Sequence, residues 1–122
     1  MLHQVFKALA DPTRLRILNL LMESPFCVCE LGQVLQLTQP LISRHLAYLK
    51  NAGLVQDHRQ GMRVQYSISI DCHNRPGFDA FLRNALSSDL ACCEDLRRCR
   101  QIGDEPGRRS KCGVTSAVPG MN

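Results

Sequence analysis

Two helix-forming segments follow each other in this chain with almost no linker between them. The first covers residues 26–36, and the second begins directly after Leu37-Thr38. In the second segment Ile42, Leu46 and Leu49 recur at a helical period, which predicts one buried stripe. Two helices joined by so short a turn are typical of a helix-turn-helix, whose second helix enters the major groove of DNA.

The outer face of the second segment carries side chains that suit nucleic acid. Thr38 is placed to cap the helix, Pro40 falls in its first turn, and Gly53 ends it. Arginine can bind guanine or phosphate bidentately, glutamine can read adenine, and serine suits a base edge or a phosphate. The alternative is an ordinary surface helix of a small domain. We predict base or nearby phosphate contacts for Gln39, Ser43, Arg44 and His45, and a contact to the DNA backbone for Lys50.

A β-hairpin is predicted after Gly53. Residues 54–59 and 63–70 alternate apolar with polar side chains, and a glycine turn separates them. Arg59, Gln60 and Arg63 cluster at the tip of this hairpin. A basic hairpin after a helix-turn-helix is the wing of a winged helix, so we predict that these residues contact DNA beside the recognition helix. The alternative is a hairpin whose charges only keep an exposed edge soluble.

The remaining apolar patterns predict helices around this unit. Residues 2–10 and 12–23 form two helices, and Asp11 caps the second. Residues 78–86 carry another apolar helical stripe, and residues 90–99 either continue that helix or begin a further one. Since a small domain has little core left to fill, we expect the stripes of the first helix and of the 78–86 helix to meet their counterparts in a homodimer. The alternative is packing within one chain.

The expected fold is mainly α with a small β-hairpin, an α+β winged helix-turn-helix. Residues 1–102 form one domain for DNA binding and dimerisation, and residues 103–122 form a flexible tail rich in Gly, Pro, Ser and Arg. The net charge of +4 favours a polyanionic partner only mildly. The sequence has no secretion signal and no apolar run near the roughly 20 residues needed to span a bilayer, so we expect a cytoplasmic protein.

Seven cysteines are unusual for such a chain. An odd number without a secretion signal indicates reduced thiols, which can bind soft metals or respond to oxidants. A thiol enzyme is disfavoured, because there is no Cys-x-x-Cys beside a βαβ pattern and no phosphate-binding glycine loop. We therefore expect no enzyme. A DNA-binding architectural protein with incidental cysteines stays a further alternative.

Four segments of the chain fit one known family. They are residues 6–18, the stretch Cys27-Val28-Cys29-Glu30-Leu31, residues 39–46, and the stretch Ala52-Gly53-Leu54-Val55. In order and spacing these segments closely resemble the ArsR/SmtB family of metal-sensing repressors, and within it the arsenic-responsive branch. The resemblance implies a dimer that binds double-stranded operator DNA and dissociates when trivalent arsenic or antimony binds cysteine thiolates, with no organic cofactor. A redox-sensing repressor of the same fold, using cysteine disulfide formation, is the alternative.

The pair Cys27 and Cys29 is our first choice for the metalloid site. Arsenic-responsive relatives often carry a third cysteine three residues after the second, where this chain has Gly32. The resemblance therefore implies a two-thiolate site, completed by solvent, another side chain or another thiol. Residues two apart on a regular helix point about 200° away from each other, so binding of one ion by both sulfurs requires a distorted helix start. The alternative is two small buried apolar residues.

A second or alternative site is the cluster Cys92, Cys93 and Cys99. Three thiols suit trivalent arsenic or antimony, and some arsenic-responsive members carry the same vicinal pair and spacing. On an unbroken helix Cys92 and Cys99 are about 10.5 Å apart in rise, whereas thiolates around one ion must lie within roughly 4 Å of each other. A trithiolate site therefore requires this segment to unwind. The alternative is cysteines that only pack or oxidise.

Overall fold

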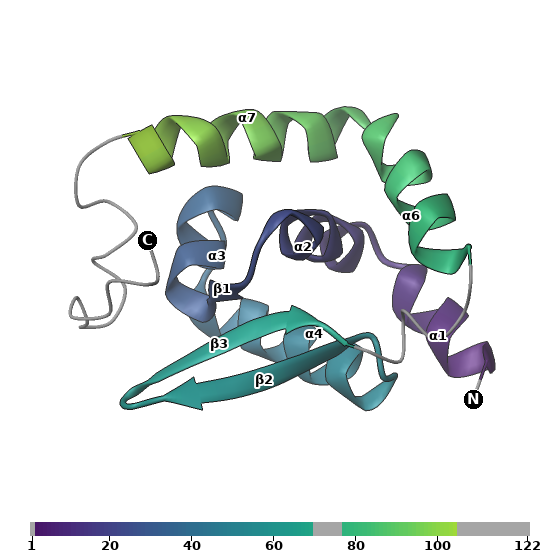
Figure 1. Cartoon of the computed structure of the whole chain (residues 1–122), viewed down its shortest axis with the longest axis horizontal. Helices are drawn as coiled ribbons and strands as arrows, with labels where there is room; N and C mark the ends of the chain where they lie inside the picture. The colour runs from purple at the N-terminus through teal and green to yellow at the C-terminus, as the bar shows by residue number, and fades with distance from the viewer. Residues whose placement is uncertain (1, 70–76, 105–122) are drawn as a thin grey trace.

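The computed structural model describes residues 2–69 and 77–104. Its helices surround a small sheet (Figure 1), which confirms the expected mainly helical α+β fold. The predicted tail at 103–122 lies outside the described residues except for its first two, which end the last helix. The elements are α1 (Leu2–Leu9), α2 (Pro12–Glu23), β1 (Phe26–Cys27), α3 (Val28–Leu35), α4 (Gln39–Asn51), β2 (Val55–Gln60), β3 (Arg63–Ile68), α6 (Phe78–Ser87) and α7 (Leu90–Asp104).

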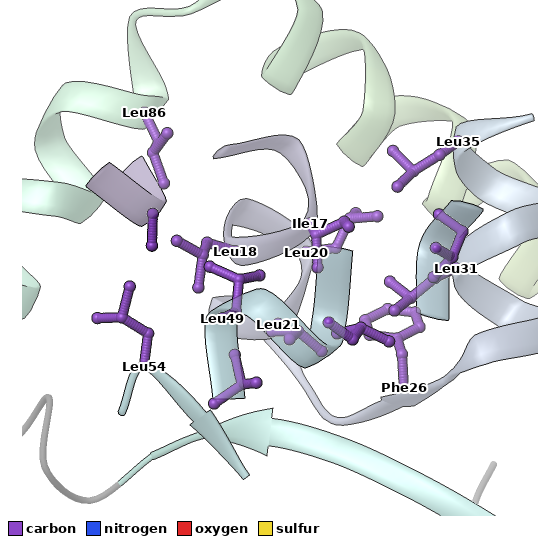
Figure 2. Close-up of a cluster of buried hydrophobic side chains, with 14 of the residues drawn as sticks. Ile17, Leu18, Leu20, Leu21, Phe26, Leu31, Leu35, Leu49, Leu54 and Leu86 are labelled. Atoms are coloured by element: carbon purple, nitrogen blue, oxygen red, sulfur yellow. The ribbon is translucent and has the colours of Figure 1, made fainter. Parts of the chain in front are cut away.

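Helix α2 is the centre of the packing. It contacts α7 on one side and β3 on the other, and α1, α3, α4 and α6 also pack against it (Figure 1). The cap predicted for its start is present, because Asp11 Oδ2 accepts the N–H of Arg14 at 3.0 Å. Figure 2 shows the apolar core that forms around α2. The fully buried side chains include Ile17, Leu18, Leu20, Phe26, Leu31, Ile42, Leu46, Leu49 and Leu54.

The sheet has three antiparallel strands in the order β1-β3-β2. The predicted hairpin is confirmed, with Gln60 opposite Arg63 and Gly61 in the turn at a φ of 64°. Strand β1 was not expected, and the prediction of one helix over residues 26–36 is wrong at its start. Phe26 pairs with Tyr66, so the backbone is extended there and α3 begins only after Cys27.

Helix α7 is a separate helix, and hydrogen bonds from polar side chains join it to the rest of the domain. Asn19 Nδ2 donates to the carbonyl oxygen of Cys92 at 3.1 Å. Arg98 Nη1 donates to the carbonyl oxygen of Val34 on α3 at 2.8 Å. The open question at residues 90–99 is therefore resolved as a further helix, which packs on both α2 and α3. Within the described ranges, no helix is both long and apolar enough to cross a membrane.

The apolar stripes of α1 and α6, which we expect at a dimer interface, are only partly exposed to solvent. Leu82 and Leu86 are buried in the chain's own core, which supports the alternative of intrachain packing for those residues. On the two helices that carry these stripes, three large apolar side chains stay open to solvent, with exposed fractions of 56% for Leu2, 55% for Phe6 and 64% for Phe81. They belong to α1 and α6, which lie at the same end of the molecule (Figure 1).

Candidate DNA interface and thiol sites

The turn between α3 and α4 depends on Gly32. Helix α3 ends at Leu35, and its cap residue Gln36 is in the left-handed conformation, with a φ of 60° and a ψ of 45°. The N–H of Leu37 then donates to the carbonyl oxygen of Gly32 at 3.2 Å. A Cβ at Gly32 would lie 3.0 Å from the carbonyl oxygen of Leu37, which is closer than an ordinary contact. The absence of a side chain here lets the turn lie directly against α3.

The outer face of α4 presents most of the predicted DNA-contacting residues. Gln39, Ser43, Arg44 and Lys50 are exposed, whereas Ile42, Leu46 and Leu49 form the predicted buried stripe. Thr38 stands at the cap position, but its side chain makes no cap hydrogen bond. Lys50 donates to Asp57 Oδ2 at 3.0 Å, and this bond lowers the pKa of the Asp57 carboxyl. Since both partners are solvent-exposed, Lys50 can exchange this partner for a phosphate.

His45 points towards α2, unlike the other predicted contacts on α4. Only 16% of its side chain is exposed, and its Nδ1 lies 3.4 Å from Arg14 Nη1 and 4.0 Å from Asp11 Oδ2. The Arg14 guanidinium also lies 4.0 Å from the centroid of the Tyr48 ring. The side chains at the start of α2 therefore hold His45 and Tyr48 in place. This placement favours a positioning role for His45 over the base contact that we predicted.

The wing presents two of its three predicted polar residues to solvent. Arg59 and Gln60 are exposed on β2. Arg63 is buried, so the expected exposure at the tip is wrong, and its contact with DNA stays a prediction. Its side chain is 5% exposed, with Nη2 3.4 Å from Cys27 Sγ and 3.7 Å from Glu30 Oε2. The cause is the unexpected strand β1, which brings the first residues of β3 next to the start of α3.

The first pair of cysteines lies at the junction between β1 and α3. Cys27 is 4% exposed and extended, with a φ of −94° and a ψ of 168°, and its N–H donates to Glu30 Oε1 at 3.0 Å. Cys27 is disulfide-bonded in this structure, whereas Cys29 is a free, half-buried thiol in the first turn of α3. Burial and then the charge of Glu30 raise the pKa of Cys29, and Arg63 partly offsets them.

This junction corrects the expected geometry of the cysteine pair. We predicted a helix that must distort before both sulfurs can bind one ion. The structure places Cys27 outside the helix, so the change of direction between the two residues is already built into the backbone. Glu30 was not among the predicted site residues, although a Glu three residues after a helix cap is the signal of a capping box.

The second set of thiols is spread along one helix. Cys92 is 1% exposed, Cys93 is exposed, and Cys99 is half-buried, all within the continuous helix α7. Burial, followed by a hydrogen bond with Asp89, raises the pKa of Cys92 to about 12. In the part of the chain that the structure describes, no three His, Cys, Asp or Glu side chains are gathered to hold a metal ion. A trithiolate site on α7 would therefore require the helix to open.

The difference in burial between Cys92 and Cys93 predicts a difference in their rates of alkylation. We expect iodoacetamide to modify Cys93 at least about tenfold faster than Cys92 in the folded protein, because the thiolate is the reactive form and Cys92 is buried with a raised pKa. Mass spectrometry of quenched time points gives both rates. The difference should vanish in urea, and equal rates in the folded protein would show that α7 opens readily.

A helix-turn-helix followed by a β-hairpin, with an exposed polar face on the second helix, defines a winged helix-turn-helix DNA-binding regulator. A family model described as bacterial regulatory protein, arsR family, matches residues 11–57. The arsenic resistance transcriptional regulator ArsR1 of Pseudomonas putida is 38% identical over 110 residues, covering 88% of this chain and 84% of the relative. The chain belongs to the ArsR family of transcriptional regulators.

Two further comparisons agree with this assignment. The arsenic resistance transcriptional regulator ArsR2 of Pseudomonas putida is 47% identical over 114 residues, covering 88% of this chain and 94% of the relative. Among solved structures, the homodimeric winged helix-turn-helix DNA-binding domain Mb0332 of Mycobacterium bovis matches with a TM-score of 0.61 and 28% identity. This match covers 71% of the present chain and 76% of the other.

Proposed function

We propose that the protein is a homodimeric repressor that releases operator DNA when trivalent arsenic or antimony binds its cysteine thiolates. The observation that carries the proposal is the position of Cys29. This thiol lines a surface hollow together with Gly32, Leu37, Thr38 and Gln39. One hollow thus joins a candidate metalloid ligand to the turn and to the first residue of the DNA-reading helix. The names of the Pseudomonas putida relatives support arsenic as the signal.

The coupling follows from this arrangement. In the reduced protein, one ligand on the Cys27 and Cys29 sulfurs would fix the first turn of α3 relative to β1. Any shift of α3 passes to α4, because the turn packs against Gly32 without an intervening side chain. Two reading helices must enter grooves about 34 Å apart. A typical coupling of about 1–3 kcal/mol is enough to release DNA, and DNA must weaken metalloid binding equally.

The homodimer is proposed from the exposed apolar residues at one end of the molecule. Leu2, Phe6 and Phe81 lie on α1 and α6 with more than half of each side chain exposed. Large apolar side chains that stay exposed on neighbouring helices are typical of an interface with another chain. The structural neighbour from Mycobacterium bovis is described as homodimeric.

The test is a gel shift with a promoter fragment that the reduced wild type retards. We expect Cys29→Ser to retard the fragment like wild type, because Cys29 lies on α3 and is not a predicted DNA contact, and to lose arsenite-induced release. The matched control is Cys93→Ser, an exposed thiol on α7, which should respond normally. Normal release by Cys29→Ser would contradict the first site and move the sensor to the α7 cysteines.

A second candidate function is a redox-responsive repressor. The observation that favours it is the disulfide bond of Cys27 in this structure, since a cysteine that forms a disulfide can respond to oxidants. In this case peroxide would change DNA binding of the reduced protein, and arsenite would not. The same gel shift, titrated with both reagents, distinguishes the two functions.

A further inference from the structure

Arg63 is a buried cation with unused hydrogen-bond donors. The residue is 6% exposed, and its Nη2 is the atom near Cys27 Sγ and Glu30 Oε2. Its Nε and Nη1 are also buried, and neither has an acceptor among the described residues. Buried donors almost always have a partner, so such atoms call for an explanation. They mark a place where an oxygen acceptor would be stabilised.

The guanidinium of Arg63 lies beside the two cysteines of the first site. Its Nη2 lies 3.4 Å from Cys27 Sγ and 3.7 Å from Glu30 Oε2, and Glu30 follows Cys29 directly in the first turn of α3. Arg63 therefore lies against the short segment that carries both sulfurs. Glu30 balances its charge in the free protein, since the two side chains form a buried ion pair. A neutral ligand with an oxygen atom would add no unpaired charge to this environment.

Arsenous acid is such a ligand once it has reacted with two thiols. Each thiol forms an As–S bond, and each displaces one hydroxyl of the acid as water, so arsenic stays trivalent and no electron is transferred. Two thiols leave one hydroxyl on arsenic. The chain has Gly32 at the position where a third cysteine would stand. The remaining hydroxyl, if it is buried, needs a hydrogen-bond donor.

We propose that Arg63 is a ligand-binding residue whose free N–H groups hold the remaining oxygen of arsenite on Cys27 and Cys29. The inference rests on the proposed function and deepens it, since the site would use two sulfurs and one oxygen in place of three sulfurs. It also links the ligand to the wing. Arg63 is the first residue of β3 and pairs with Gln60 at the hairpin turn. A displacement of Arg63 on ligand binding would therefore shift both strands of the wing.

X-ray absorption at the arsenic edge tests the coordination directly. The sample is the reduced full chain carrying Cys92→Ala, Cys93→Ser and Cys99→Ala, loaded with one equivalent of arsenite in a buffer without small thiols. We expect two As–S bonds and one As–O bond. Three As–S bonds would show that a thiol from elsewhere completes the site, and would overturn the role of Arg63.

Substitution of Arg63 gives the second readout. Arg63→Lys keeps the charge beside Glu30 but removes donors, and we expect arsenite to bind about tenfold more weakly, which corresponds to the loss of one good hydrogen bond. The matched control is Arg59→Lys on the exposed face of the wing, which should bind arsenite like wild type. Unchanged affinity in a folded Arg63→Lys variant would overturn the inference. Failure of arsenite to release DNA from the wild type would instead overturn the proposed function.

Discussion

Replacing Arg16 by methionine is expected to lower the free energy of unfolding by roughly 2–4 kcal/mol, because it leaves a buried carboxylate without its main partner. Asp95 on α7 is 1% exposed. Arg16 donates to both of its oxygens, with Nε at 2.8 Å and Nη2 at 2.9 Å. Among the described residues, the other donor to this carboxylate is Arg98 Nη1 at 3.4 Å, which is too long to compensate. The same hydrogen bond raises the pKa of Arg16, so the cation is present at any practical pH.

The control for this prediction is Arg97→Met. Arg97 lies 3.5 Å from Glu94, but the two side chains are 69% and 57% exposed, so the change should stay within about 0.5 kcal/mol. Urea denaturation followed by circular dichroism, at equal protein concentration, gives both values. The double variant Arg16→Met/Asp95→Leu should recover much of the loss, because the uncompensated charge is then gone. A double variant as unstable as Arg16→Met would show that the loss of stability comes from lost packing and not from the unpaired Asp95 carboxylate.

The features predicted correctly from the sequence are those that neighbouring residues determine. The cap of α2 needs only Asp11 and the N–H of Arg14 three residues later. The buried stripe of α4 is visible because Ile42, Leu46 and Leu49 share one face of a single helix. The hairpin follows from alternation around Gly61. In each case the residues that give the signal lie close together in the sequence.

The features that the sequence did not reveal depend on contacts between distant elements. Strand β1 is two residues long, too short for any periodicity, and it exists because Phe26 pairs with Tyr66. The burial of Arg63 beside Cys27 follows from that pairing, so it was missed for the same reason. His45 has the sequence position of a DNA contact but lies against residues of α2.

The two thiol sites differ in the same way. The sequence alone indicated that an unbroken helix would separate Cys92 from Cys99, because the rise of a helix is a local property. It gave no sign that Cys92 would be buried and Cys93 exposed, since this depends on α2, where Asn19 bonds the carbonyl oxygen of Cys92. Burial of a thiol is therefore a tertiary property, even where the helix that carries it is predictable.

Arg44→Ala is expected to weaken operator binding about 10- to 100-fold, the cost of losing one bidentate base contact of about 1–3 kcal/mol. Arg44 is exposed on the outer face of α4, and its side chain is not needed for the buried stripe of that helix. Arg97→Ala is the control, because α7 lies on the opposite side of the molecule from α4 (Figure 1). Fluorescence anisotropy with the operator and with unrelated DNA of equal length measures both affinities.

The comparison of the two DNAs separates base reading from phosphate binding. Loss of Arg44 should reduce operator affinity more than affinity for unrelated DNA, because a base contact carries sequence information and a phosphate contact does not. Arg59→Ala on the wing should weaken binding to the operator and to unrelated DNA by the same factor. It should also reduce the slope of log affinity against log salt concentration by about one. If Arg44→Ala instead weakened binding to both DNAs equally, Arg44 would be a phosphate contact. The base contacts of α4 would then be made by Gln39 and Ser43. If it changed neither affinity, α4 would not be the reading helix.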